Sequence, residues 1–249
     1  KKSELYAMIN RIIFMQLAYD GTAYAGWQIQ PNAKTVQGTI ESCLTKLNAN
    51  QPIQIVGCGR TDTGVHAKQY FIHFEFFEVE LDQLVYKLNK MLPSDIKIIE
   101  ASYTAYHARF DAKRRTYRYF IAKEKSPFND RFCWVYERPL SVETMNIACS
   151  YLIGQHDFAS FAKGDTDVKT TLCDVYSASW EETNEGYVFE VSANRFLRNM
   201  VRAMVGTLME VGIGNIEPEA IPIILAKKSR QEAALSVPAK GLFLWEILY

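Results

Sequence analysis

The 249-residue sequence lacks any apolar run near the roughly 18 residues that a transmembrane helix needs. Its beginning also lacks a signal peptide pattern, because the apolar stretch after residue 10 is short and is interrupted by Gln16. We expect residues 1–10 to be an N-terminal tail, with Met8 as a candidate start. Apolar residues make up 48% of the chain and charged residues 22%. This composition is typical of a soluble globular protein, which we expect to be cytoplasmic.

Patterns for disulfides, metals and nucleotide cofactors are also missing. The five cysteines are odd in number and scattered without a CxxC, and the four histidines form no HExxH or i, i+4 pair. A GxGxxG fingerprint starting at Gly57 would need glycine where Asp62 stands, and GxxxxGK[ST] occurs nowhere. A GxSxG nucleophile motif is absent as well. We therefore expect a reduced protein without a cofactor or a metal.

The chain also has no excess of either charge, with 28 Lys and Arg against 28 Asp and Glu. A zero sum argues against a protein that coats nucleic acid nonspecifically. The basic residues are nevertheless clustered. Residues 107–118 contain five Lys or Arg residues and one acidic residue, and residues 195–202 contain three arginines and no acidic residue. Arginine suits phosphate, and the aromatic residues among these clusters suit unstacked bases. The two clusters favour contact with phosphate or nucleic acid over plain solvated faces.

Hydrophobic periodicity predicts the same order of elements in two halves of the chain. The first half reads as strand 11–18, helix 36–48, strands 53–57 and 69–77, helix 82–91 and strand 96–103. The second reads as strand 114–123, helix 141–153 with Ser141 as its N-cap, strands 171–180 and 186–194, helices 195–211 and 218–228, and strand 242–248. Each half has the β-α-β-β-α-β order of a ferredoxin-like unit.

The repeated order predicts an α+β fold of two ferredoxin-like halves that share a mostly antiparallel central sheet, with helices on one side. We place the N-terminal half, which carries the Asp62 loop, at residues 11–104, and the C-terminal half at residues 105–249. Coincidence is the competing interpretation, since the order of elements alone supports the duplication.

The most informative stretch is the glycine-rich loop GCGRTDTGVHAK, residues 57–68. Its glycines permit close approach of a ligand to the main chain, and the loop presents Arg60 and Asp62 two residues apart. Residues 62–64 spell the DTG of aspartic proteases, whose chemistry needs two carboxylates that share a proton. This chain has one copy, beside Arg60 in a polar loop and in a mixed α/β pattern, so the protease interpretation is disfavoured.

Residues 59–67, GRTDTGVHA, closely resemble the catalytic motif of the tRNA pseudouridine synthase A family (TruA), which usually has alanine in place of Thr63. Further segments resemble other blocks of that family in the same order: YDGTAYAGWQIQ (19–30), TVQGTIE (35–41), FDAKRRTYRY (110–119), HDFASF (156–161), ANRFLRNMVRAMVGTLMEVG (193–212) and GLFLWEILY (241–249). The resemblance extends over nearly the whole chain.

The resemblance implies a homodimeric enzyme that uses no cofactor and no metal. Such an enzyme isomerises uridine to pseudouridine at positions 38, 39 and 40 of the tRNA anticodon stem-loop. It implies Asp62 as the nucleophile, which attacks either C6 of the uracil or C1′ of the ribose; the sequence does not choose between them. Tyr117 corresponds to the tyrosine that packs on the target base, and Arg202 to the arginine that pairs with the catalytic aspartate.

Two further positions follow from the same resemblance. Arg60 corresponds to the arginine that helps to flip the base out of the stack, and Leu242 to an apolar residue of the pocket floor. Phosphate contacts are expected from Arg109, Lys113, Arg114, Arg195 and Arg198. The alternative from another class is a non-catalytic RNA-binding module, which would need the same basic residues but not the sequence Arg60-Thr61-Asp62.

Overall fold

The computed structural model describes residues 12–76, 79–163 and 169–249. The predicted N-terminal tail, residues 1–10, lies outside these described residues. The chain has a mixed α/β fold with a large, mostly antiparallel sheet, as predicted. By its internal contacts it divides into two compact units, one of Lys1–Lys113 with Glu246–Tyr249 and the other of Arg114–Trp245.

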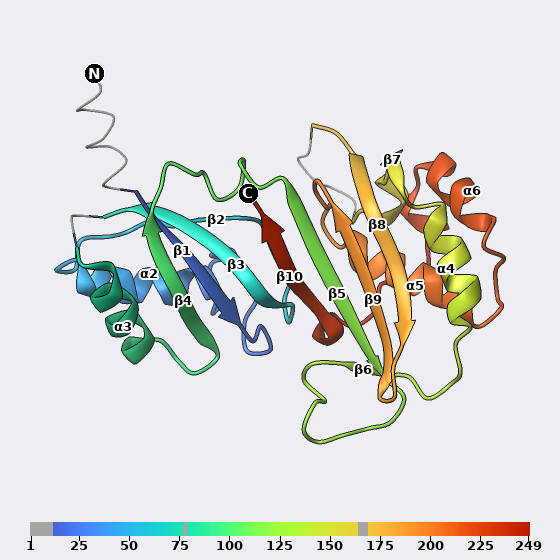
Figure 1. The fold of residues 1–249 in the computed structure, drawn as a ribbon, viewed down its shortest axis with the longest axis horizontal. Helices are drawn as coiled ribbons and strands as arrows, with labels where there is room; N and C mark the ends of the chain where they lie inside the picture. The colour runs from blue at the N-terminus through green and yellow to red at the C-terminus, as the bar shows by residue number, and fades with distance from the viewer. Residues whose placement is uncertain (1–11, 77–78, 164–168) are drawn as a thin grey trace. The chain divides into compact units, whose positions relative to one another are not determined.

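The first unit follows the predicted β-α-β-β-α-β order. Its elements are β1 (Ile12–Tyr19), α2 (Val36–Leu47), β2 (Val56–Gly57), β3 (His66–Glu75), α3 (Leu81–Met91) and β4 (Ile96–Tyr103). Strand β1 lies between β3 and β4 and pairs antiparallel with both, while β2 pairs with the middle of β3 (Figure 1). Because the end of β1 pairs with the start of β3 (Tyr19 with Ala67), the loop before β3 lies at the end of the sheet where β1 ends.

Every second side chain of β1, together with its partners on β3, contributes to the core of the first unit. Ile13, Met15 and Leu17 are fully buried, and their partners on β3 are Phe74, Ile72 and Tyr70. Because side chains alternate across a strand, these residues share one face of the sheet. Helix α2 begins after Thr35, which is its N-cap because its side chain accepts a hydrogen bond from the Gly38 N–H.

Strand β2 is shorter than the predicted strand 53–57. The backbone N–H of Ile53 donates to the Thr45 hydroxyl at 3.3 Å, and that of Ile55 donates to the Glu41 carboxylate at 3.0 Å. Both acceptors belong to α2, so these two N–H groups bond to a helix instead of to a neighbouring strand. Of residues 53–57, only Val56 and Gly57 pair with β3.

The second unit also shows the predicted order, with short additions. Its elements are β5 (Arg114–Ala122), β6 (Trp134–Val135), α4 (Val142–Ser150), β7 (Gly154–Asp157), β8 (Leu172–Glu182), β9 (Gly186–Ala193), α5 (Met200–Gly212), α6 (Ala220–Lys227) and the first four residues of β10 (Leu242–Leu248). Short 3-10 helices occupy Ala159–Phe161, Arg230–Glu232 and Ala239–Gly241. Strands β5, β9, β8 and β7 are neighbours in that order and pair antiparallel (Figure 1).

Helix boundaries in the second unit differ in part from the predicted ones. Ser141 is the N-cap of α4 as predicted, because its side chain accepts from the Thr144 N–H, but the helix ends at Ser150 and not at 153. The predicted helix 195–211 begins only at Met200. Asn199 stands before it with φ of 66°, a left-handed conformation that cannot continue a right-handed helix. Residues 195–199 therefore form a non-helical segment between β9 and α5.

Helix α5 is the centre of the second unit's core. Eleven of its thirteen residues are buried, including Met200, Met204 and Leu208, so it is apolar around most of its circumference. Such a helix must be covered on several sides.

Among the described residues no helix has the length and hydrophobicity that spanning a membrane would require. All five cysteines are free thiols and buried.

Candidate active site

The loop that carries Asp62 connects β2 to β3 in the first unit. The Cys58 N–H donates to the Phe71 carbonyl at 2.9 Å, and the Tyr70 hydroxyl donates to the Gly59 carbonyl at 2.5 Å, so the loop starts against β3. A turn follows, in which the Val65 N–H donates to the Asp62 carbonyl at 3.1 Å. Asp62 is half-buried at the head of this turn, and Arg60 is exposed.

Residues 19–30 brace the other side of this loop. The Trp27 N–H donates to the Thr61 carbonyl at 3.2 Å, and the Tyr19 hydroxyl lies 2.9 Å from the buried Thr61 hydroxyl. Gly26 has φ of +85°, and a Cβ atom there would lie 2.5 Å from the Thr61 carbonyl oxygen. Only glycine suits both this backbone conformation and this close approach. Two hydrogen bonds and the close approach of Gly26 therefore fix Thr61, the residue immediately before Asp62.

His66 anchors the end of the loop. Its ring is fully buried, and its Nδ1 accepts a hydrogen bond from the Gly21 N–H at 3.0 Å and lies 3.1 Å from an Asp20 carboxylate oxygen. His66 thus ties the start of β3 to the segment after β1, as expected for a hydrogen-bonded histidine. Among the described residues, no group of three or more His, Cys, Asp or Glu side chains could hold a metal ion.

Tyr117 lies on β5 in the second unit, opposite Val191 of β9. The residue is half-buried, and its ring meets that of Phe196 edge to face, with centroids 5.0 Å apart and planes at 83°. Phe196 belongs to the non-helical segment 195–199, between Arg195 and Arg198. The structure therefore brings Tyr117 next to the second arginine cluster.

Arg202 lies in the first turn of α5 and is bound to the segment after α6. Its Nε donates to the Val237 carbonyl at 2.7 Å, and the Val237 N–H donates back to the Arg202 carbonyl at 3.3 Å. This reciprocal pair fixes the orientation of the guanidinium relative to α5. It also makes the position of the guanidinium depend on the segment 229–237.

The segment 229–237 is itself held by polar contacts close to Val237. The Ser236 hydroxyl accepts from Asn199 Nδ2 at 2.5 Å and from Arg230 Nη2 at 3.0 Å. Burial lowers the pKa of Arg230 from its ordinary value. At Gly206 a Cβ atom would lie 2.0 Å from the Leu235 carbonyl oxygen, so α5 and this segment are in direct backbone contact.

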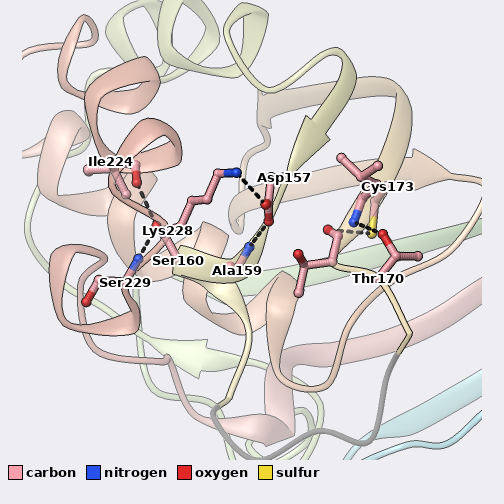
Figure 2. Close-up of polar contacts among 10 residues, drawn as sticks. Asp157, Ala159, Ser160, Thr170, Cys173, Ile224, Lys228 and Ser229 are labelled. Carbon is pink, nitrogen blue, oxygen red and sulfur yellow. Dashed lines mark hydrogen bonds and ion pairs between the residues drawn. The ribbon is translucent and has the colours of Figure 1, made fainter.

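The block HDFASF anchors the beginning of the same segment (Figure 2). The Ser160 hydroxyl donates to the Ile224 carbonyl at 2.6 Å and accepts from the Ser229 N–H at 3.0 Å. The Asp157 carboxylate accepts from the Ala159 N–H at 3.1 Å and lies 3.1 Å from the Lys228 ammonium. Burial raises the pKa of Asp157, but hydrogen bonds from Thr171, Lys228 and Ala159 outweigh burial and hold it below its ordinary value. The block therefore supports the start of the segment 229–237, whose other end bonds to Arg202.

The remaining predicted residues are distributed over both units. Leu242 begins β10 and is buried. Arg109 and Lys113 are exposed in the first unit; in the second, Arg198 is exposed and Arg114 and Arg195 are half-buried. Arg60 and Asp62 thus belong to the first unit, whereas Tyr117, Arg202 and Leu242 belong to the second.

Sequence reasoning missed the contacts that hold these residues in place. Thr61 and Gly26 stand inside recognisable blocks, so their importance could have been inferred from those blocks. Arg230 and Ser236 lie in a segment without regular periodicity, and no pattern in the sequence pointed to them.

Comparisons with known proteins identify the family of this chain. A family model described as tRNA pseudouridine synthase matches residues 148–249. The chain is 45% identical over 244 residues to a tRNA pseudouridine synthase A of Parabacteroides distasonis, and the match covers 96% of both chains. It is 42% identical over 244 residues to the Bacteroides fragilis protein of the same name, covering 95% of each, and 38% identical over 239 residues to that of Bacillus pumilus, covering 94% of this chain and 97% of the relative. This chain belongs to the tRNA pseudouridine synthase A family.

Proposed function

We propose that this protein isomerises uridine to pseudouridine in tRNA, at positions 38, 39 and 40 of the anticodon stem-loop, with Asp62 as the nucleophile. The observation that carries the proposal is the braced loop around Asp62 in a chain that aligns almost end to end with proteins named tRNA pseudouridine synthase A. A loop fixed before and after its carboxylate can present that carboxylate to a substrate without reorganising, and pre-organised geometry supplies a large part of enzymatic rate enhancement.

The reaction exchanges one bond of the ribose for another. The bond between C1′ and N1 breaks, a bond between C1′ and C5 forms, the proton on C5 leaves, and N1 gains a proton. Asp62 adds either to C6 of the uracil or to C1′ of the ribose, which keeps the base or the sugar bound while the base turns. Both routes need an ionised, correctly aimed carboxylate.

The other site residues receive roles in the same reaction. Tyr117 packs on the flipped uracil and assists removal of the C5 proton, and Arg202 keeps Asp62 ionised through its positive charge. The edge-to-face contact with Phe196 and the bond to Val237 support these roles, because they fix the two side chains. Arg60 helps to expel the base from the stack, and Leu242 lines the pocket floor.

The substrate is proposed to bind along the basic residues. Phosphate contacts come from Arg109, Lys113, Arg114, Arg195 and Arg198, whose guanidinium and ammonium groups suit phosphate oxygens. We further propose that the protein works as a cytoplasmic homodimer, since a twofold axis would provide two copies of these residues for one large RNA.

The experiment is incubation of the unmodified protein with tRNA that carries tritium at C5 of its uridines. Release of tritium without added cofactor, followed by mapping of pseudouridine in the product, is expected to show modification at positions 38–40. Binding of tRNA without tritium release would instead identify a non-catalytic RNA-binding module. Pseudouridine found only outside the anticodon stem-loop would contradict the proposed position.

A further inference from the structure

Phe110 is an exposed aromatic side chain in the first unit, with 74% of its surface accessible. It belongs to the Phe110 turn, residues 107–111, which follows β4 and precedes β5. Burying a phenylalanine would stabilise the fold by roughly 1.5–3 kcal/mol relative to leaving it exposed. A phenylalanine that remains exposed on a well-held turn is therefore a candidate for contact with a partner.

The Phe110 turn is rigid because four consecutive backbone N–H groups are bonded to side chains. The His107 N–H donates to the Asp111 carboxylate at 2.7 Å, and the Ala108 N–H donates to His73 Nδ1 at 3.0 Å. The Arg109 and Phe110 N–H groups both donate to His107 Nδ1 at 3.2 Å. The Asp111 N–H then closes the turn onto the His107 carbonyl at 3.1 Å.

The turn is also fastened to the sheet of its unit. Ala108 is fully buried, and its carbonyl accepts from the Tyr249 hydroxyl at 2.6 Å. The Tyr249 ring packs against Phe14 and Phe71 of the sheet, with centroids 5.0 and 5.1 Å apart. The exposed ring of Phe110 therefore projects from a fixed base, and ordering it on binding costs little conformational entropy.

The surroundings of the Phe110 ring have the chemistry of a nucleobase stacking site. The His107 ring is stacked on it, with centroids 4.3 Å apart and an interplanar angle of 27°, and the Arg109 guanidinium lies 5.7 Å from its centroid. Lys113 is exposed two residues beyond the turn, whereas the acid of the turn, Asp111, accepts the His107 N–H. Aromatic rings with flanking cations are the common means of holding unpaired bases and their phosphates.

We propose that the Phe110 turn is a stacking site for an unpaired base of the substrate RNA, with Arg109 contacting the adjacent phosphate. The proposal rests on the proposed function, since it takes tRNA as the partner. An RNA base is favoured over a purely apolar partner because the ring is accompanied by cations. The role belongs to substrate binding and not to the chemical step.

The experiment measures the affinity for an unmodified tRNA transcript at several salt concentrations, for the full chain and four variants. Phe110→Ala should weaken binding about 5- to 150-fold, because loss of one base–aromatic stack has an effect of that size. The slope of log affinity against log salt should stay unchanged. Phe110→Tyr, which keeps the ring, should bind as the unmodified protein does, and so should Phe128→Ala, which removes another highly exposed phenylalanine.

Arg109→Ala provides the contrasting readout. Loss of one phosphate contact should reduce the salt slope by about 0.7–0.9, whereas loss of a stack should not. Equal affinity of Phe110→Ala and Phe128→Ala would overturn the proposal. A Phe110→Ala protein that sediments as a smaller species than the unmodified protein would also overturn it, because the ring would then cover a second copy of the chain.

Failure of this inference can be distinguished from failure of the proposed function. If the unmodified protein releases tritium from tRNA but Phe110→Ala binds RNA normally, only the stacking site is wrong. If the unmodified protein releases no tritium, the proposed function is wrong whatever the Phe110 variants do.

Discussion

At the scale of single residues, the surroundings of Asp62 depend on one glycine outside its own loop. Gly26 combines a positive φ with contact to the Thr61 carbonyl, and Trp27 beside it supplies the N–H that bonds this carbonyl. An error of about 1 Å in the position of a catalytic group can cost two orders of magnitude in rate. The backbone around residue 26 should therefore influence both stability and turnover.

We predict that Gly26→Ala lowers the free energy of unfolding by about 1–3 kcal/mol, because alanine is strained at positive φ and its Cβ would meet the Thr61 carbonyl. Turnover should fall by more than the loss of folded protein explains. Urea unfolding and tritium release measure the two effects. Gly59→Ala is the matched control for stability, since a Cβ atom there meets nothing within 4 Å. Equal stability of the two variants would contradict the account.

His73 gives the Phe110 turn a dependence on pH. Burial lowers the pKa of His73 below its ordinary value, the neighbouring His107 lowers it further, and Asp111 partly opposes both. The folded chain therefore binds fewer protons here than the unfolded chain. Stability from this residue should be complete above the ordinary pKa of 6.5 and should be lost as the pH falls through the lower folded-state pKa.

We predict that the unmodified protein loses more stability than His73→Asn when the pH is lowered from 7.5 to 5. In the unmodified protein the Ala108 N–H donates to His73 Nδ1. An asparagine at position 73 still offers a side-chain oxygen to this N–H, but its side chain does not titrate. Urea unfolding of both proteins across this range provides the comparison. Parallel pH profiles of the two proteins would show that His73 does not titrate in this way.

At the scale of elements, the segment 229–237 determines how Arg202 is held. Arg230 and Asn199 both bond to the Ser236 hydroxyl, and the next residue provides the carbonyl that accepts from Arg202. Arg230 touches neither Asp62 nor substrate in this account and acts through the segment. It is a positioning residue.

We predict that Arg230→Ala lowers kcat about tenfold or more while KM for tRNA changes little, because it disturbs the orientation of Arg202 and not the basic surface. Arg230→Lys should restore only part of kcat, since one ammonium cannot replace the two guanidinium bonds, to Ala233 and to Ser236. Lys227→Ala is the matched control; it removes an exposed ion pair with Glu232, and such pairs contribute little. A rise in KM alone would contradict the positioning role.

Elements with clear periodicity or caps could be predicted well from the sequence. Strand β4 has the predicted bounds 96–103, and Ser141 caps α4 as predicted. Strand β7 was not predicted, because residues 154–157, Gly-Gln-His-Asp, show no apolar alternation and form a strand only by pairing with β8. The predicted start of α5, residue 195, was wrong, because Asn199 has a left-handed conformation and the helix begins only after it. Asn199 bonds to Ser236, which lies far from it in the sequence, so the sequence pattern gave no sign of this.

The candidate site shows the same division between motif and tertiary contact. Arg60 and Asp62 could be selected from their glycine-rich loop, and Tyr117 and Arg202 from the resemblance. What holds them was not visible, because the contacts form only after folding: Trp27 bonds to Thr61 beside Asp62, Phe196 packs on Tyr117, and Val237 bonds to Arg202.

At the scale of the whole molecule, some of the balancing charges form ion pairs with each other on the sheet of the second unit. Arg118 of β5 faces Glu190 of β9, with Nε and a carboxylate oxygen 2.6 Å apart, and Lys123 pairs with Glu182 at 2.6 Å. Arg118 also lies over the Trp245 ring at 4.4 Å. Arg115 is engaged too, because its Nη1 donates to the Asn194 carbonyl at 2.8 Å. The basic cluster 107–118 therefore contains at least two arginines engaged within the fold, and not every charge in it should be assigned to RNA.

We predict that the unmodified protein sediments as a dimer of about twice 28.5 kDa at the concentrations at which it is active. Two copies would offer one tRNA a larger basic surface than a single chain provides. Sedimentation equilibrium with a parallel activity assay measures both properties in the same solution. A fully active monomer would contradict the homodimer.

The central claim, that Asp62 is the nucleophile of uridine isomerisation, is tested most directly by comparing Asp62→Asn with Thr63→Ala. Both variants change one side chain in the same loop, and Thr63→Ala installs the residue usual in the family. Asp62→Asn should bind tRNA with unchanged affinity and lose tritium release from C5 by about 10⁴-fold or more, as expected when a nucleophile is removed. Thr63→Ala should retain release. Release undiminished in Asp62→Asn would contradict the account.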